Sequence, residues 1–207
     1  SGREAGIAYG LAERHRDLVA GSQVVANPGC YPTGVLCSLL PLRDEGLIEE
    51  DRLTVVNAAS GVTGAGRTPR VDLLFAEVSG NYRAYGEGNR HRHLKEIRAL
   101  LFSTQLLFQP HLLPVARGIL ETITLPVRPG VHAAEIREVW RKTYAGSFAI
   151  EVVDGLPGLT EVVGTDRLAL GACDVEGVAP AVVTVVAALD NLGKGAAGAA
   201  VAAAKLL

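Results

Sequence analysis

The stretch Gln23-Val24-Val25-Ala26-Asn27-Pro28-Gly29-Cys30-Tyr31-Pro32-Thr33 decides how this chain begins to fold. Residues 23–26 form a short apolar run typical of a buried strand, and Asn27-Pro28-Gly29 is a strong turn signal that stops it. From Tyr31 to Leu42 the apolar residues recur at helical spacing, with Pro32 in the first turn, where a missing N–H is tolerated. Pro41 and Gly46 indicate the end of this helix. The sequence therefore predicts a strand, a turn and a helix, with Cys30 at the helix N-terminus.

Cys30 occupies a position where a thiol can be activated. Backbone N–H groups and the helix dipole favour a thiolate there, and the same N–H groups can hold an oxyanion when a carbonyl is attacked. The alternative is a small buried apolar side chain, which describes most free cysteines. That second interpretation is the one we adopt for Cys37 and Cys173. No C-x-x-C pair occurs, so zinc and dithiol chemistry are not expected.

Composition limits the class of protein. At 207 residues the chain can form one domain or slightly more, and 48% of its residues are apolar. A net charge of −2 argues against a nucleic-acid surface. No apolar run approaches the roughly 20 residues of a membrane span, and no secretory signal opens the chain. Three cysteines, an odd number, fit a reducing, cytoplasmic setting. Because methionine is absent, we expect that Ser1 is not the native start and that a segment precedes it.

Two further motifs carry candidate chemistry. Residues 60–67, Ser-Gly-Val-Thr-Gly-Ala-Gly-Arg, form a glycine-rich loop that lacks the Lys-Ser/Thr ending of a nucleotide P-loop, yet its terminal guanidinium matches a phosphoryl group. An ordinary connecting loop is the alternative. Residues 89–93, Asn-Arg-His-Arg-His, place two imidazoles among two guanidiniums, which suggests a general acid or base beside anion-binding arginines. A solvated basic turn is the alternative there, and we see no further ligands for a metal.

The remaining pattern predicts an α+β fold with a mixed, largely antiparallel sheet, because strands cluster in the second half without regular βαβ alternation. Residues 1–20 suggest a polar helical or irregular approach segment, and 110–114 a turn-rich connection. Helices are predicted at 93–101, 133–144 and 195–207, and strands at 53–59, 104–109, 119–127, 149–153, 168–175 and 181–188.

Taken together, these motifs resemble the N-acetyl-gamma-glutamyl-phosphate reductase family (type 1). The matching runs are NPGCYPTGVL, SGVTGAGR, EVSGNYRAYGEGNRHRH, PHLLPVARGIL and DNLGKGAAGAA, which occur in the family's order along nearly the whole chain. The resemblance implies the C-terminal domain fold of glyceraldehyde-3-phosphate dehydrogenase, with helices packed on one face of the sheet. It also implies an arginine-biosynthesis enzyme that uses NADPH, needs no metal, and forms a homodimer or homotetramer without nucleic-acid or membrane partners.

The resemblance also implies roles for individual residues. Cys30 would attack the acyl phosphate and form a thioester, with His93 as the first choice and His91 as the second for proton transfer. Ser60, Arg67 and Arg117 would bind the carboxylate or phosphate of the substrate, and Asn191 would approach the nicotinamide. The full set of site residues that the resemblance implies is Cys30, His91, His93, Ser60, Arg67, Arg117 and Asn191.

One departure from the family concerns the cofactor. The family carries an N-terminal Rossmann domain with a glycine-rich dinucleotide fingerprint, and this chain contains none. We therefore expect residues 1–190 to form the catalytic and dimerisation domain, and 191–207 a terminal helix that packs on a cofactor domain lying outside this sequence.

Several alternatives stay open at this point. A lysine-pathway or aspartate-semialdehyde relative would share the acyl-phosphate chemistry. A cofactor-free cysteine hydrolase or transferase would use Cys30 and a histidine, and an inactive assembly module would use neither.

Overall fold

The computed structural model describes residues 6–66, 68–86, 88–101 and 105–207. Strands in chain order are β1 (Ile7–Tyr9), β2 (Val24–Ala26), β3 (Thr54–Ser60), β4 (Arg83–Ala84), β5 (Leu106–Leu112), β6 (Ile119–Pro126), β7 (Ile150–Val152), β8 (Leu168–Asp174) and β9 (Val182–Leu189). Helices are α1 (Arg16–Ala20), α2 (Cys30–Asp44), α3 (Phe75–Val78), α4 (His93–Leu101), α5 (Ala133–Thr143) and α6 (Gly198–Ala204). Short helical turns are η1 (Val62–Ala65), η2 (Val71–Leu73), η3 (Leu159–Glu161) and the π-helical turn η4 (Gly193–Ala197).

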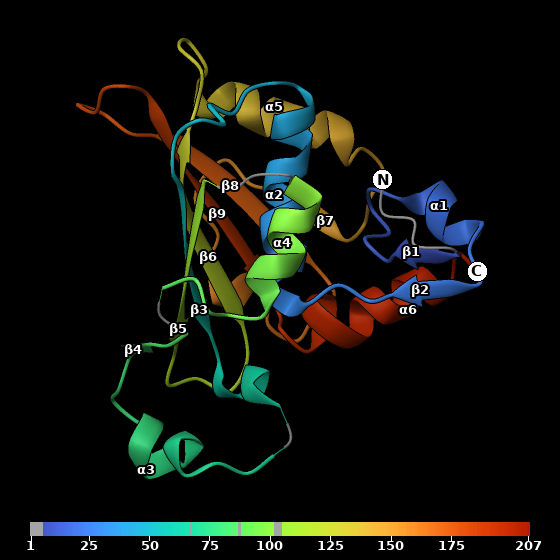
Figure 1. The fold of residues 1–207 in the computed structure, drawn as a ribbon, viewed down its shortest axis with the longest axis vertical. Coiled ribbons are helices and arrows are strands. Elements are labelled where there is room, and N and C mark those ends of the chain that lie inside the picture. Colours follow the sequence, from blue (N-terminus) through green and yellow to red (C-terminus); the bar gives the residue numbers. More distant parts are fainter. Residues whose placement is uncertain (1–5, 67, 87, 102–104) are drawn as a thin grey trace.

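A seven-stranded sheet in the order β4-β5-β3-β6-β9-β8-β7 forms the centre of the molecule. Its β4–β5, β3–β6, β6–β9 and β8–β9 pairings are antiparallel, whereas β3–β5 and β7–β8 are parallel. Helices α2, α4 and α5 all lie on one face of this sheet (Figure 1). The predicted α+β class, with a mixed and largely antiparallel sheet covered on one face, is confirmed.

The core lies between this sheet and its helices. Alternate residues of β6 point to the helices and are buried, among them Ile119, Ile123 and Leu125, while Leu120 and Thr122 on the other face are only half-buried. This is the two-residue period of a strand with one face packed. Trp140 and Phe108 are the largest apolar side chains buried in this layer.

Helix α2 runs from Cys30 to Asp44, close to the helix predicted from Tyr31 to Leu42, and Pro41 lies inside its last turns. Proline removes the N–H that would bond the carbonyl of Cys37, four residues earlier. The hydroxyl of Tyr144 replaces that donor, at 2.7 Å from the Cys37 oxygen, and the indole N–H of Trp140 donates to the Ser38 oxygen at 2.8 Å. Of the two predicted end signals, Pro41 therefore lies inside the helix, because two side chains of the α5 segment supply hydrogen bonds that the α2 sequence does not reveal, and Gly46 follows its end.

The N-terminal strands form a separate two-stranded parallel sheet. The prediction of a buried strand at 23–26 was wrong in burial, since Val24 is 55% exposed and no strand of the large sheet covers it. The predicted irregular approach at 1–20 contains β1 and α1 in its described part. Figure 1 shows this unit beside α6, and Ala8, Val19 and Ala203 share a small core there.

Strand β5 runs through the segment predicted as a turn-rich connection. The carbonyl of Pro110 accepts the Tyr85 N–H at 3.0 Å, on the side facing away from β3. Because a residue's N–H and C=O point to the same side of a strand, the missing N–H of Pro110 costs no bond to β3. The predicted start of this strand at residue 104 lies outside the described residues. The terminal helix also differs, since η4 precedes a shorter α6.

Candidate active site

Cys30 is the first residue of α2 and is half-buried. Gly29 precedes it in an extended conformation, with φ −66° and ψ 156°, and its carbonyl accepts the Thr33 N–H at 3.0 Å. The backbone N–H groups of Cys30 and Tyr31 point at the sulfur, as the first N–H groups of a helix are free to do. The predicted strand, turn and helix therefore place the thiol where N–H groups converge.

The resting state of Cys30 is the thiol. Burial raises its pKa to about 11, and Glu121 adds to this effect, while the N–H groups of Tyr31 and Cys30 and the guanidinium of Arg92 oppose it. Burial therefore outweighs the helix N-terminus in setting the protonation state. Attack on a carbonyl then needs a base that removes the proton in place.

His93 lies against the turn that carries Cys30. A Cβ built on Gly29 would be 2.8 Å from His93 Nε2, so only glycine leaves room for this imidazole next to the thiol. Burial, followed by His91 and Arg92, lowers the pKa of His93 to about 4. A neutral imidazole with a free nitrogen can accept a proton. His93 is therefore a candidate proton acceptor packed against the turn that carries Cys30.

His91 contacts both the backbone and the ring of His93. Its Nδ1 accepts the backbone N–H of His93 at 3.2 Å, and the two rings meet edge to face with centroids 4.9 Å apart. Burial lowers its pKa as well. Tyr31 packs edge to face on both imidazoles, and its hydroxyl lies 2.8 Å from the hydroxyl of Tyr85. His91 thus orients His93 and faces the cavity described below.

Glu96 was missed by the sequence prediction. It lies one turn after His93 on α4, accepts the Gly29 N–H at 2.9 Å and accepts the Tyr9 hydroxyl at 2.6 Å. The carboxylate therefore holds the turn in front of Cys30 from the same helix that carries the imidazole. Its i, i+3 spacing from His93 was a usable signal.

A cavity of about 280 Å³ opens beside these residues. It contains none of the α2 residues, yet Tyr85, His91 and Arg92 line it, and Tyr85 and Arg92 are within electrostatic reach of the Cys30 sulfur. Three guanidiniums therefore face one hollow near the thiol, together with a single carboxylate. The lining residues are Ser60, Gly61, Gly64, Ala65, Arg70, Asp72, Leu73, Arg83, Tyr85, His91, Arg92 and Leu112.

The three arginines of this cavity are not equivalent. Arg70 binds Asp72 through two hydrogen bonds of 2.9 and 2.7 Å, and Arg83 reaches the same carboxylate at 3.0 Å. Within the described part of the chain, Arg92 has no hydrogen-bond or ion-pair partner. Its guanidinium is the one best placed to meet an anion beside Cys30. The basic motif at 89–93 signalled Arg92, whereas nothing in the sequence distinguished Arg70 and Arg83.

The predicted substrate residues differ in what they contact. Ser60 ends β3, lines the cavity and is only 3% exposed. A Cβ on Gly64 would lie 2.7 Å from the Ser60 hydroxyl, which explains one glycine of the loop. Arg117 instead binds the buried Asp190 through two contacts of 3.2 and 3.0 Å, away from the cavity lining. Arg67 lies outside the described residues.

Asn191 is buried behind the same loop. Its carbonyl oxygen accepts the Gly118 N–H at 2.8 Å, and its amide donates to the Thr63 hydroxyl at 2.9 Å. The side chain thus ties the end of β9 to the glycine-rich loop, and one amide hydrogen is left for another partner.

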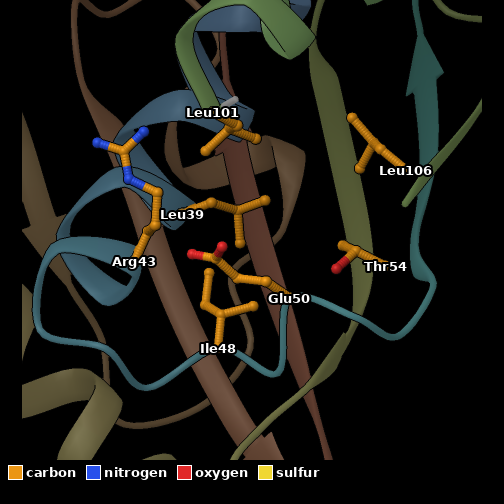
Figure 2. A pocket seen from close by; sticks show the side chains of 7 residues that line it. All are labelled: Leu39, Arg43, Ile48, Glu50, Thr54, Leu101 and Leu106. Atoms are coloured by element: carbon orange, nitrogen blue, oxygen red, sulfur yellow. The ribbon is translucent and has the colours of Figure 1, made fainter. Parts of the chain in front are cut away.

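Other features carry no comparable chemistry. Figure 2 shows a hollow of about 20 Å³ lined mainly by apolar side chains such as Leu39, Ile48 and Leu106, large enough for one water molecule. In the described ranges, no three His, Cys, Asp or Glu side chains gather as metal ligands. Of the helices in those ranges, none has the length and apolar character to cross a membrane.

The candidate site thus combines a thiol at a helix N-terminus, a histidine packed against the turn before it and an arginine-lined cavity nearby. Residues 30–191 match the family described as semialdehyde dehydrogenase, dimerisation domain, and the chain belongs to this family.

Curated relatives extend this result. The chain is 42% identical over 206 residues to an N-acetyl-gamma-glutamyl-phosphate reductase of Pelobacter propionicus, covering 93% of this chain and 57% of that protein. It is 41% identical over 191 residues to the reductase of the same name from Aeromonas salmonicida, covering 92% and 54%. The chain thus spans little more than half the length of these relatives.

Solved structures agree on the fold. The crystal structure of aspartate semialdehyde dehydrogenase II from Vibrio cholerae superposes with a TM-score of 0.76 at 19% identity, covering 99% of this chain and 69% of that chain. A probable aspartate-semialdehyde dehydrogenase from Pseudomonas aeruginosa gives a TM-score of 0.76 at 20% identity, covering 100% and 69%.

Proposed function

We propose that this chain is the catalytic half of an enzyme that reduces N-acetyl-gamma-glutamyl phosphate to the semialdehyde, with NADPH as reductant and release of phosphate. The observation that carries the proposal is the neutral His93 packed against the turn of Cys30, beside a cavity lined by arginines. The names of the curated relatives supply the particular acyl phosphate.

In the first step His93 takes the proton of Cys30. The thiol and the imidazole are both neutral at rest, so proton transfer creates an ion pair whose sulfur is held by the N–H groups of Cys30 and Tyr31. The thiolate then attacks the acyl carbonyl. A bond forms between the sulfur and the acyl carbon, the bond from that carbon to the bridging phosphoryl oxygen breaks, and phosphate leaves with the proton that His93 took from Cys30.

Arg92 is suited to the charge that develops on the leaving group, because it faces the cavity without a partner among the described residues. Arg83 and Arg70 both bind Asp72 in the lining of the cavity, and they suit the second anionic group of the substrate. We thus assign to Arg92 and Arg83 the role that the sequence gave to Arg67 and Arg117. Ser60 keeps its predicted place in the cavity.

The bound nicotinamide cofactor supplies hydride to the thioester carbon. Asn191 fits a contact at the edge of such a site through its one free amide hydrogen, and the rest of the site belongs to the part of the enzyme outside this chain. When the aldehyde leaves, the Cys30 sulfur is released as a thiolate, and His93 can pass on to it a proton taken up from solvent.

The decisive experiment is C30A in the full-length enzyme, assayed in the reverse direction with semialdehyde, phosphate and NADP⁺. We expect a loss of at least about 1,000-fold in kcat, because nucleophile removal leaves only binding and electrostatic contributions. C173A, the other half-buried cysteine, is the matched control and should retain activity. Activity retained by C30A would refute the proposal and favour a role in assembly alone.

We also propose that the enzyme is a cytoplasmic homo-oligomer. The face of the seven-stranded sheet opposite α2, α4 and α5 is available for assembly, and the name of the matched family supports assembly through this domain. Sedimentation of the full-length protein tests it, and a monomer at micromolar concentration would contradict it.

A further inference from the structure

A buried ion pair lies outside the machinery described above. The ammonium of Lys194 contacts the carboxylate of Glu13, and their side chains are only 2% and 7% exposed. Removing charges from water is costly unless they are paired closely, and apolar residues of similar size are often as stable. Such a pair therefore calls for a reason other than stability alone.

Lys194 belongs to η4, the turn that stands directly behind the nucleophile. Its neighbour Gly195 packs so closely on Cys30 that an added Cβ would lie 2.9 Å from the Cys30 Cβ. Gly195 and Ala197 donate to carbonyls five residues earlier, at 2.9 and 3.1 Å, which makes the turn π-helical. Turns of this kind are rare and occur frequently at functional sites.

Glu13 binds Lys194 of η4 from a segment that lies far from η4 in the sequence. It lies just after β1, and β1 pairs along its length with β2, which leads into Asn27 and Cys30. The amide of Asn27 in turn donates to the Ala196 carbonyl of η4 at 3.3 Å. The pair therefore joins η4, which packs on Cys30, to the segment that follows β1, the strand paired with the one that leads to Cys30.

We infer that Glu13 and Lys194 are positioning residues, whose ion pair seats the π-helical turn against Cys30 and thereby fixes the direction of its thiol. The inference rests on the proposed role of Cys30 as nucleophile. Neither residue touches the substrate. Loss of the pair should therefore lower kcat and thiol reactivity while leaving KM nearly unchanged.

The test uses the full-length enzyme and reads Cys30 directly. Iodoacetamide alkylation of the Cys30 peptide, followed by mass spectrometry at fixed pH, is measured beside kcat and KM for K194M, E13Q and the double variant. A shift of about 1 Å in a reacting group costs roughly 100-fold, so we expect the alkylation rate and kcat to fall by about 10- to 100-fold. The exposed pair Arg167–Glu151, at 2.9 Å, gives the control R167M/E151Q, which should change neither.

The double variant separates positioning from stability. E13Q/K194M leaves no unpaired buried charge, so its thermal stability should exceed that of either single variant. We expect its Cys30 alkylation to stay slow. If alkylation and kcat recover together with stability, the pair is merely structural and the inference is overturned.

A second variant tests the contact itself. G195A adds one methyl group against the Cys30 Cβ and should lower alkylation and kcat with little change in KM. G155A is the matched control, because a Cβ there meets nothing within 4 Å. Wild-type alkylation in G195A would overturn the inference.

If K194M and E13Q fail to fold, K194R and E13D keep the charges and change only their reach. Unchanged kcat and alkylation in both would then overturn the inference. Because alkylation needs no substrate, its outcome is independent of whether C30A abolishes the reductase reaction.

Discussion

Two regions meet at the cavity and differ in almost every physical respect. The thiol centre, which we define as Cys30, His93 and Glu96, lies at the N-termini of α2 and α4 and is enclosed by packed side chains and hydrogen bonds. The projecting arm, residues 61–85 without Arg67, extends away from the helices (Figure 1) and exposes Phe75 to 85%. The comparison teaches that the groups we propose for bond formation rest on helices, whereas two of the arginines that line the cavity come from the arm.

The largest effect is expected when the thiol centre is disabled and the arm is left intact. H93Q removes the base and keeps a polar side chain of similar size. We expect kcat to fall by roughly 100- to 10,000-fold, the usual contribution of general acid–base catalysis, with little change in KM. Steady-state kinetics of the full-length enzyme measure it. H91Q removes a ring that contacts His93 but leaves the His93 imidazole, so its loss should be smaller, and an equal or larger loss in H91Q would show that His91 and not His93 is the base.

The arm should respond in the opposite way. R83M removes a guanidinium that faces the cavity, and we expect KM for the acyl phosphate to rise by about 10- to 100-fold, since hydrogen bonds to charged groups contribute about 1.5–3 kcal/mol. The effect on kcat should be smaller than for H93Q. An unchanged KM in R83M would place the second anionic group of the substrate elsewhere.

A third effect concerns stability beneath the thiol centre. Glu121 is fully buried, neither of its carboxyl oxygens has a hydrogen-bond partner among the described residues, and burial raises its pKa well above the ordinary value of a glutamate. The small residues Gly34, Ala58 and Ala187 leave room for it. Because the folded-state pKa is raised, the free energy of unfolding is highest below about pH 4.5 and falls as pH rises towards the folded-state pKa.

E121Q should therefore remove this pH dependence. Relative to the wild type, its free energy of unfolding should increase as pH rises from 5 to 8, by about 1.4 kcal/mol for each unit of the pKa shift within that interval. Urea unfolding at several pH values measures the difference. A constant difference across this range would show that Glu121 does not titrate with unfolding.

The smallest effect is expected far from both regions. Y144F removes only the hydroxyl that donates to the Cys37 carbonyl in α2. A net loss of about 1 kcal/mol is typical for one hydrogen bond, and kcat should not change. Urea unfolding together with steady-state kinetics checks both parts. Altered kcat would mean that the middle of α2 transmits strain to Cys30.

Local pattern was sufficient for much of the fold. The helix predicted at 93–101 is α4 with the same bounds, and the strand, turn and helix around Cys30 form as expected. The local signals mislead at two prolines. Pro41 lies inside α2, where Tyr144 donates to the Cys37 carbonyl, and Pro110 lies inside β5 because its missing N–H faces away from β3.

The candidate site divides in the same way. Cys30, His91, His93 and Ser60 were found from motifs that place chemistry-bearing residues next to glycine or at a helix start, and the structure brings them to one region. Arg117 is held by Asp190, 73 residues later in the chain, a contact that no local motif reveals.

By itself, the sequence determined the secondary structure around Cys30 and the residue types available for chemistry, because turn signals, periodicity and helix N-termini act within a few residues. Only the tertiary structure decided which groups share a dielectric environment. Burial raises the pKa of Cys30 and lowers that of His93, so both groups are neutral. Packing also encloses Glu13 and Lys194 together, and Arg92 has no partner within the described part of the chain. Burial and pairing are sums over segments far apart in the chain, and they form only when the sheet and its helices pack.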